Sequence, residues 1–224
     1  MASEIRLLMG GPQGAGLETA AQVLSTAYAV HGLRVYSYRE YYSNIKGRHT
    51  YILIRARPDR TPYAPREGPG IISAIDAESV FHHYSEAVEG TIIIYNEADA
   101  KRRLNGLVSM EPATRRRISA ALEAEGCEKT VSGALKCAEK RGASLLGLNY
   151  ALLLRELSRK TGIPPHRARR FQNTIPMAAA AYLTGLSING LERGFERRFR
   201  GKQEIIEGNT ELARIVYELS LIHI

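Results

Sequence analysis

The sequence predicts an α/β fold, in which helices cover both faces of a mostly parallel sheet and a helical layer closes the domain. Three observations predict it. Short apolar runs typical of buried strands alternate with segments whose apolar residues recur every three or four positions. A glycine-rich turn joins the first run to the first such segment. After Gly142 only helical spacing is found. Together they predict a doubly wound, Rossmann-like domain with a C-terminal helical layer.

The first predicted unit is a strand, a helix and a second strand. Residues 4–9 (EIRLLM) form a short apolar run that stops at Gly10. Residues 17–31 place apolar or small side chains on one helix face, and Gly32 stands where a helix cap belongs. Residues 33–38 (LRVYSY) make the second strand. The three elements predict a βαβ unit with a right-handed crossover.

Three more strands are predicted before the chain becomes hard to interpret. They lie at residues 49–57 (HTYILIRAR), 70–75 (GIISAI) and 91–95 (TIIIY), with a helix expected at 77–88 between the last two. Residues 96–140 give the weakest pattern, in which only a helix over 112–125 is expected.

The C-terminal part is predicted to be helical. Residues 145–157 are apolar on nearly every side, as in a helix packed between a sheet and a second helical layer. Further helices are predicted at 175–184, 189–199 and 204–219. We expect one domain over residues 1–219, with residues 220–224 (SLIHI) as a truncated or non-native tail.

The composition is that of a globular chain with a basic surface. It has 224 residues, 44% of them hydrophobic, which suffices for one sizeable core. The 31 Lys and Arg against 23 Asp and Glu give a net charge of +8. Much of the excess lies in arginine clusters on segments with helical spacing, which are either solvated helix faces or a surface for a partner. No nucleic-acid recognition signature accompanies the charge, so we predict no nucleic-acid partner.

The two cysteines, Cys127 and Cys137, are too few for a zinc or iron-sulfur site, which needs about four ligands. We expect them to be unpaired, as in a reducing compartment. No stretch approaches the roughly 18 apolar residues of a membrane helix. The N-terminus runs into a strand pattern without the apolar core of a signal peptide. These features predict a cytoplasmic protein without a membrane partner.

The glycine-rich turn GGPQGAG is the first candidate binding motif. It stands between a strand and a helix, where backbone amides and the helix N-terminus favour an anion. Its spacing from Gly11 is GxxGxG and not the GxGxxG of dinucleotide sites, and the Lys-Ser/Thr ending of a P-loop is missing. Glu40 is a poor ribose ligand because it is expected to follow the second strand. A structural turn or partner contact, a coenzyme contact and a dinucleotide site therefore stay open, with Gly11, Gln13, Gly14 and Gly16 as the candidate residues.

The polar loop at residues 39–49 is the second candidate. It follows a strand at the carboxyl edge of the sheet, where ligands sit in open α/β sheets. Lys46 and Arg48 are suited to hold a carboxylate, with Asn44 as a further donor. The alternative is a solvated hairpin. His82 and His83 lack the HExxH spacing of a zinc helix, which favours packing over metal binding. No catalytic residue is assigned to this chain.

These residues resemble a known family. Residues 5–57, which include the specific segment YYSNIKGRH, are similar to the gamma region of 2-oxoacid:ferredoxin oxidoreductases, especially the form in which gamma is fused ahead of alpha. Residues 172–218 resemble the closing helices of the same region. The stretch between them adds nothing to the resemblance. A fused enzyme would continue into the alpha region, so the chain looks truncated.

The resemblance implies oxidative decarboxylation of a 2-oxoacid, such as pyruvate or 2-oxoglutarate, with coenzyme A to an acyl-CoA and reduced ferredoxin. It implies that thiamine diphosphate, Mg²⁺ and an iron-sulfur cluster belong to the rest of the complex, that this region docks on alpha and beta regions, and that it is inactive alone. Lys46 would then contact the substrate carboxylate, supported by Arg48 and Asn44. The alternative function is a stand-alone nucleotide-binding regulatory domain that uses GGPQGAG.

Overall fold

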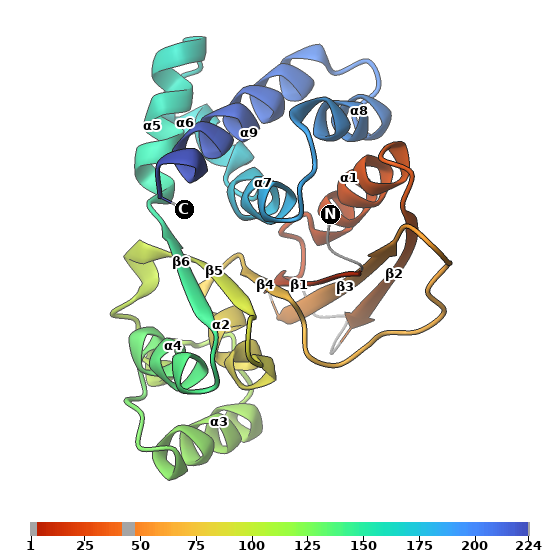
Figure 1. Ribbon diagram of the computed structural model, residues 1–224. Helices are drawn as coiled ribbons and strands as arrows, with labels where there is room; N and C mark the ends of the chain where they lie inside the picture. Colours follow the sequence, from red (N-terminus) through yellow and green to blue (C-terminus); the bar gives the residue numbers. More distant parts are fainter. Residues whose placement is uncertain (1–3, 42–47, 224) are drawn as a thin grey trace.

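A computed structural model describes residues 4–41 and 48–223 of the chain, without the side chains of Tyr41 and of residues 220–223. Within them a six-stranded sheet runs through the centre, in the order β2-β3-β1-β4-β5-β6, and helices lie on both faces (Figure 1). The strands are β1 (Ile5–Pro12), β2 (Arg34–Tyr41), β3 (His49–Arg57), β4 (Ile71–Ala74), β5 (Ile92–Asn96) and β6 (Ser144–Leu148).

The sheet is mixed but mostly parallel, which confirms the predicted fold class. β1, β4, β5 and β6 pair in parallel, whereas β3 runs antiparallel between β1 and β2. Because β3 opposes both neighbours, β1 and β2 point the same way, as in the predicted βαβ unit, with β3 inserted between them. The ends of β1 and β2 and the start of β3 therefore share one edge of the sheet.

The larger helical layer covers one face of the sheet (Figure 1). Side chains along β1 alternate between the two faces of the sheet. Leu7 and Met9 point into this layer, and Leu8 points into the opposite one. Gly194 lets α8 approach α1 closely, because a Cβ there would lie 2.6 Å from the carbonyl oxygen of Val23. The layer consists of α1 (Leu17–Val30), α5 (Tyr150–Thr161), α6 (Pro165–Ala168), η4 (Arg169–Phe171), α7 (Thr174–Leu183), α8 (Ile188–Arg198) and α9 (Gln203–His223).

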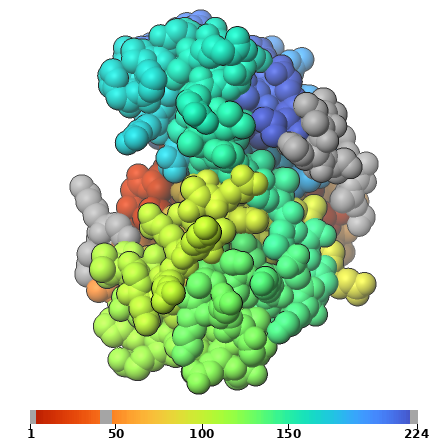
Figure 2. Space-filling model, turned by 90° about the vertical axis from the view of Figure 1, so that its left-hand side faces the viewer, coloured from red at the N-terminus to blue at the C-terminus, as the bar shows by residue number. Residues whose placement is uncertain are grey.

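The smaller layer covers the opposite face and has its own apolar cluster. In the view of Figure 2 the segment that carries α3 and α4 forms the lower lobe, with α5 above it. The layer consists of α2 (Ala77–His83), η1 (Tyr84–Glu86), η2 (Glu97–Asp99), η3 (Leu104–Gly106), α3 (Pro112–Ala124) and α4 (Val131–Lys140). The predicted helix at 112–125 is confirmed, whereas the helix expected at 77–88 ends early in a 3₁₀ turn.

The prediction of one helix over residues 145–157 was wrong. Residues 144–148 form the edge strand β6, and Asn149 caps the helix that follows by accepting a hydrogen bond from the amide of Leu152 (3.0 Å). Leu145 packs against one layer and Leu146 against the other, so both faces of the strand are apolar. A strand of this kind gives the same continuous apolar run as a buried helix.

The second strand is longer than predicted, so Glu40 lies inside β2 and not after it. Its carboxylate accepts a hydrogen bond from the hydroxyl of Tyr38 (2.5 Å). The backbone oxygen of Glu40 accepts a hydrogen bond from Thr50 of the neighbouring strand. The residue is thus held within the sheet at its outer edge.

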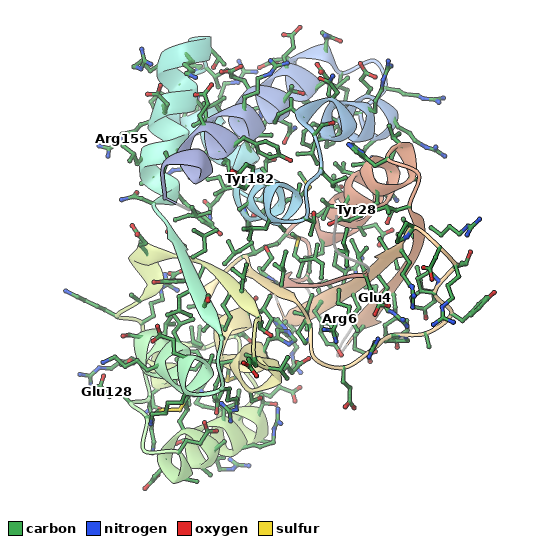
Figure 3. The ribbon with its side chains drawn as sticks, viewed as in Figure 1. Glu4, Arg6, Tyr28, Glu128, Arg155 and Tyr182 are labelled. Atoms are coloured by element: carbon green, nitrogen blue, oxygen red, sulfur yellow. A yellow bond between two sulfur atoms is a disulfide. The ribbon has the colours of Figure 1, made fainter. Side chains whose placement is uncertain are left out.

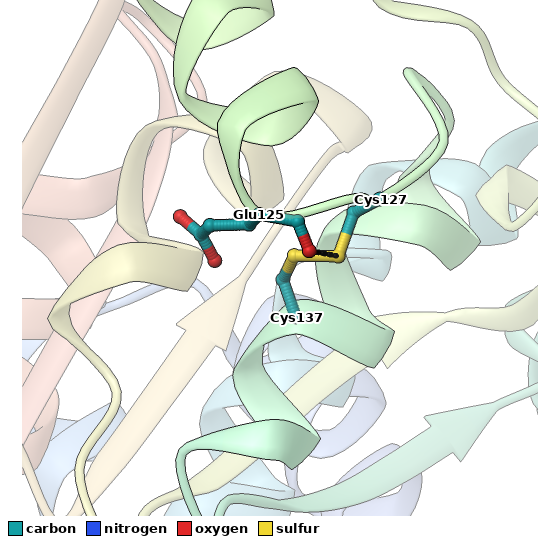
Figure 4. A group of neighbouring side chains, drawn as sticks. All are labelled: Glu125, Cys127 and Cys137. Atoms are coloured by element: carbon teal, nitrogen blue, oxygen red, sulfur yellow. Dashed lines mark hydrogen bonds between the residues drawn. A yellow bond between two sulfur atoms is a disulfide. The ribbon is translucent and has the colours of Figure 1, made fainter.

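The cysteines are not unpaired, which corrects the prediction from the sequence. Cys127 and Cys137 form a disulfide between the turn after α3 and the middle of α4, with their Cα atoms 6.2 Å apart (Figure 4). Glu125 lies beside the pair and forms an ion pair with Arg141 (2.8 Å). The sequence missed the bond because ten residues separate the cysteines and nothing local shows that two helices bring them together.

At the opposite edge of the sheet, Glu4 joins the start of β1 to the long connection after β3. Figure 3 labels Glu4 and Arg6 in this region, and both line the same cavity. Burial tends to raise the pKa of Glu4, but hydrogen bonds and charges from Arg55 and Arg66 outweigh it and lower that pKa. Within the described part of the chain, no helix has the length and apolar character needed to cross a membrane.

Candidate functional site

Two candidate loops meet at the carboxyl edge of the sheet. Pro12 at the end of β1 is in register with His49, and Tyr41 at the end of β2 with Thr50. The backbone amide of Gln13 donates to the carbonyl oxygen of Arg48 (2.7 Å), which ties the glycine-rich turn to the base of the polar loop. Asn44 and Lys46 of that loop lie outside the described residues.

Arg48 is the candidate residue of the polar loop that the structure places. Its guanidinium pairs with Glu111, the residue before α3, and both side chains are partly exposed. Because its carbonyl accepts a hydrogen bond from Gln13 as well, Arg48 contacts both the turn after β1 and the residue before α3. The loop is therefore anchored at the point where β3 begins.

The glycines of GGPQGAG divide into two groups with different roles. Gly10 and Gly11 are buried in β1, and a Cβ on Gly11 would lie 3.1 Å from the side chain of Ile75. Gly14 and Gly16 instead have φ angles of 97° and 79°, a region that favours glycine, and they form the turn that starts α1. Gly11 is thus explained by packing, and Gly14 and Gly16 by the turn.

A cavity of about 260 Å³, which we call the α1 cavity, opens beside the start of α1. The side-chain amide of Asn173 donates to the carbonyl of Ala15 and so joins the turn to α7. The other walls come from the closing helices. Its lining includes Gly16, Thr19, Arg170, Phe171, Phe195 and Phe199.

The α1 cavity combines an apolar wall with groups that attract anions. Three phenylalanines form the wall, and the first turn of α1 supplies backbone amides. Arg170 also lines the cavity, and its guanidinium pairs with Glu204 (2.7 Å). Such a cavity suits a ligand with an alkyl or planar part and an anionic group. The sequence shows only the glycine turn, because the remaining walls come from segments about 150 or more residues away whose apolar spacing indicates nothing beyond helix packing.

A second, smaller cavity of about 110 Å³ is lined in part by Arg48, and we call it the histidine cavity. Its lining includes Arg48, His49, Glu78, His82, Ser109 and Arg117. Ser109 donates its hydroxyl proton to the buried carboxylate of Glu78, and His82 lies 3.6 Å from the same carboxylate. The ring of His49 stacks on that of His82, with 4.1 Å between the ring centres.

His49 and His83 form a buried pair behind this cavity, with 2.8 Å between their Nε2 atoms. Gly10 makes room for them, because a Cβ there would lie 3.0 Å from each ring. Burial lowers the pKa of both imidazoles, so they are neutral near pH 7. The sequence singled out His82 and His83 only as packing residues, and no local signal pairs them with His49.

Among the described residues, one group has the proximity of metal ligands, namely Glu125, Cys127 and Cys137. The two sulfur atoms are bonded to each other, and the ammonium of Lys140 lies 3.7 Å from the sulfur of Cys127. Bonded sulfur atoms and a neighbouring positive charge both disfavour a metal ion at this group. The group is better described as a disulfide that joins α3 to α4.

Solved structures share this fold over nearly the whole chain. The gamma subunit of a keto/oxoacid ferredoxin oxidoreductase from Geobacter sulfurreducens aligns with a TM-score of 0.63 and 14% identity, over 99% of this chain and 98% of that one. The PORC subunit of pyruvate oxidoreductase from Thermotoga maritima aligns with a TM-score of 0.60 and 19% identity, over 97% of both chains. A 2-oxoglutarate:ferredoxin oxidoreductase from Magnetococcus marinus, solved with 2-oxoglutarate, coenzyme A and succinyl-CoA bound, gives 0.67 and 17%, over 98% of this chain and 32% of that one. The fold is thus that of the gamma-type subunits of 2-oxoacid oxidoreductases.

Sequence comparison carries the assignment further. Residues 6–219 match the model of the pyruvate ferredoxin/flavodoxin oxidoreductase family, and the chain belongs to that family. Two relatives from Aeropyrum pernix are the alpha subunits of 2-oxoacid:ferredoxin oxidoreductases 1 and 2, which are 38% and 33% identical over 216 and 215 residues. These alignments cover 94% and 96% of this chain but only 33% of each relative, so the chain spans about a third of their length.

Proposed function

We propose that this chain is the gamma-type region of a thiamine-dependent 2-oxoacid:ferredoxin oxidoreductase. The enzyme would convert a 2-oxoacid, such as 2-oxoglutarate or pyruvate, and coenzyme A into an acyl-CoA and CO₂, with the electrons passing to ferredoxin. The family match over residues 6–219 is the observation that carries the proposal. The Aeropyrum relatives are about three times as long as this chain, which supports the view that this region is fused to an alpha region.

The cofactors of the reaction belong, on this proposal, to other regions. An iron-sulfur cluster needs about four thiolates. The chain has two cysteines, and they are bonded to each other in the structure. The chain therefore does not fit a cluster, and we assign the cluster, thiamine diphosphate and Mg²⁺ to the alpha and beta regions on which it docks.

The carboxyl edge of the sheet is the part that we propose faces the substrate. Lys46 is the preferred contact for a substrate carboxylate, with Asn44 as a second donor. Arg48 supports Lys46 by holding the end of the loop, since its carbonyl and its guanidinium are engaged by Gln13 and Glu111.

The α1 cavity is the part that we propose meets coenzyme A. Of the four candidate residues, Gly16 lines the cavity, Gly14 shapes the turn beside it, Gln13 binds the Arg48 loop, and Gly11 packs within β1. The apolar wall suits the alkyl part of a coenzyme, and the backbone amides at the start of α1 suit its anionic part. A stand-alone nucleotide-binding domain is the less favoured function, because the turn lacks both dinucleotide and P-loop spacing.

Two assays of the isolated chain separate these functions. The chain supplied with thiamine diphosphate, Mg²⁺, coenzyme A and a low-potential dye should reduce nothing when a 2-oxoacid is added, because it has no group that generates the thiamine ylid. Titration with NAD, ATP and coenzyme A should favour coenzyme A. Turnover by the chain alone, or tight binding of NAD or ATP in preference to coenzyme A, would contradict the proposal.

A further inference from the structure

A chain of hydrogen bonds links the surface of the protein to the buried histidine pair. At its outer end is Glu86, whose side chain is 45% exposed. The Nδ1 atom of His83 lies 2.6 Å from the Glu86 carboxylate, and its Nε2 atom lies 2.8 Å from the Nε2 atom of His49. His49 lines the histidine cavity at the inner end.

The protonation state of each ring follows from the bonding. An ionised carboxylate can only accept a hydrogen bond, so His83 carries its proton on Nδ1. Since His83 is neutral, its Nε2 atom is the acceptor, and His49 must donate from its own Nε2 atom. That leaves Nδ1 as the unprotonated nitrogen of His49. From Nδ1 of His83 to Nδ1 of His49, ring nitrogens with and without a proton therefore alternate. A proton can pass along such a chain in one direction.

The surroundings keep both rings in the neutral state. Desolvation is the largest influence on the pKa of each ring and lowers it, whereas Glu86 and the more distant Asp76 act to raise that of His83. His82 opposes protonation of both rings. The rings of Tyr51 and His83 pack in a T-shaped arrangement, with 4.9 Å between their centres. A relay between neutral imidazoles requires no buried charge at rest.

We propose that Glu86, His83 and His49 form a proton relay between solvent and the histidine cavity. A proton that arrives at Nδ1 of His49 is matched by transfer of the Nε2 proton of His49 to His83 and of the Nδ1 proton of His83 to Glu86, which releases it to water. One proton enters and one leaves, both rings end neutral in the opposite tautomer, and no electrons are exchanged. The reverse sequence delivers a proton to the cavity.

The position of the relay indicates which reactions it would serve. The histidine cavity adjoins Arg48, and so lies at the edge of the sheet where the candidate loops meet. A thiol or an acid that loses a proton at that edge needs a nearby proton acceptor, and the His49 end of the relay supplies one. The relay itself is defined by residues of this chain alone. Its test needs neither a partner nor the proposed function, so failure of one leaves the other standing.

The first test is nitrogen NMR of the full chain with ¹⁵N-labelled histidine. We expect His83 as the Nδ1–H tautomer, His49 as the Nε2–H tautomer, and a scalar coupling between the two Nε2 nuclei across their hydrogen bond. The opposite tautomers, or a protonated ring near pH 7, would overturn the relay. Zinc that shifts these signals at equimolar concentration would also overturn it, because it would make the cluster a metal site.

The second test measures exchange of the ring N–H protons with water. Glu86→Gln keeps an oxygen that accepts from His83 but removes the group that takes up the proton, so exchange at His83 and His49 should slow by about tenfold or more. Glu89→Gln is the matched control, because Glu89 is an exposed carboxylate three residues further along, and it should change nothing. Equal exchange rates in Glu86→Gln and in the unmodified chain would mean that His49 and His83 form only a packing contact.

Discussion

Among single residues, Lys46 of the polar loop gives the first prediction. If the Lys46 ammonium holds the remote carboxylate of 2-oxoglutarate in the assembled enzyme, Lys46→Ala removes a charge-assisted hydrogen bond of roughly 1.5–3 kcal/mol. The kcat/KM for 2-oxoglutarate should then fall roughly ten- to over a hundredfold. Pyruvate has no second carboxylate, so its use should change much less.

The comparison between the two substrates separates this role from damage to docking. Lys101→Ala removes an exposed lysine elsewhere and should leave both substrates unaffected. Equal losses for the two substrates in Lys46→Ala would assign Lys46 to an interface, and no loss for either would make the loop a solvated hairpin.

The buried histidines predict a loss of stability in acid. Burial lowers the pKa of His49 and His83 in the folded chain, whereas the unfolded chain binds protons near pH 6.5. The unfolded state therefore takes up more protons below that pH, and folding weakens as the pH falls. The free energy of unfolding should therefore drop between pH 7.5 and 5.5, and a histidine that stays neutral in the folded chain throughout this range contributes about 1.4 kcal/mol to the drop.

Urea unfolding across this pH range measures the effect. His83→Gln should remove about half of the pH dependence, while His166→Gln, at an exposed position, should leave it intact. A free energy of unfolding that rises between pH 7.5 and 5.5 would show that the two histidines are not buried as neutral rings.

At the scale of elements, the disulfide joins α3 to α4 in the smaller layer. A bond of this kind stabilises a chain by about 2–4 kcal/mol, mainly by restricting the unfolded state. Reduction should therefore lower the Tm of this 224-residue chain by roughly 5–15 °C. Calorimetry with and without a phosphine reductant measures the change.

Cys127→Ser is the matched variant, because Cys127 is partly exposed whereas Cys137 is fully buried. It should unfold at the temperature of the reduced protein and should not respond to reductant. A Tm that is the same in oxidised, reduced and variant protein would mean that the two cysteines are not bonded in solution.

The elements also show what sequence patterns can and cannot predict. The first strand, the first helix and β3 were predictable because their periodicity is local and their ends carry glycine or polar residues. The apolar run at 145–157 gave a wrong prediction of one helix because β6 is covered on both faces. A continuous apolar run cannot distinguish such a strand from a buried helix. The disulfide and the insertion of β3 between β1 and β2 depend on contacts between distant segments, which no local spacing encodes.

The candidate site was predictable only in part for the same reason. The glycine turn and the polar loop are continuous in sequence, so both were found. The histidine pair draws on β3 and α2, and the α1 cavity draws on α1, η4 and three closing helices. Arg48 was predicted as a ligand for a carboxylate, but its partner in the structure, Glu111, stands 63 residues away.

At the scale of the whole molecule, the central claim is that this chain does the work of the gamma region in a larger enzyme. The direct test replaces the matching third of the Aeropyrum pernix alpha subunit, which is 38% identical, with this chain. The hybrid is assembled with its partner subunit, and reduction of ferredoxin that requires both a 2-oxoacid and coenzyme A is measured beside the same enzyme without that third. We predict clear activity in the hybrid and none in the deletion. A hybrid that folds and assembles but is no more active than the deletion would contradict the claim.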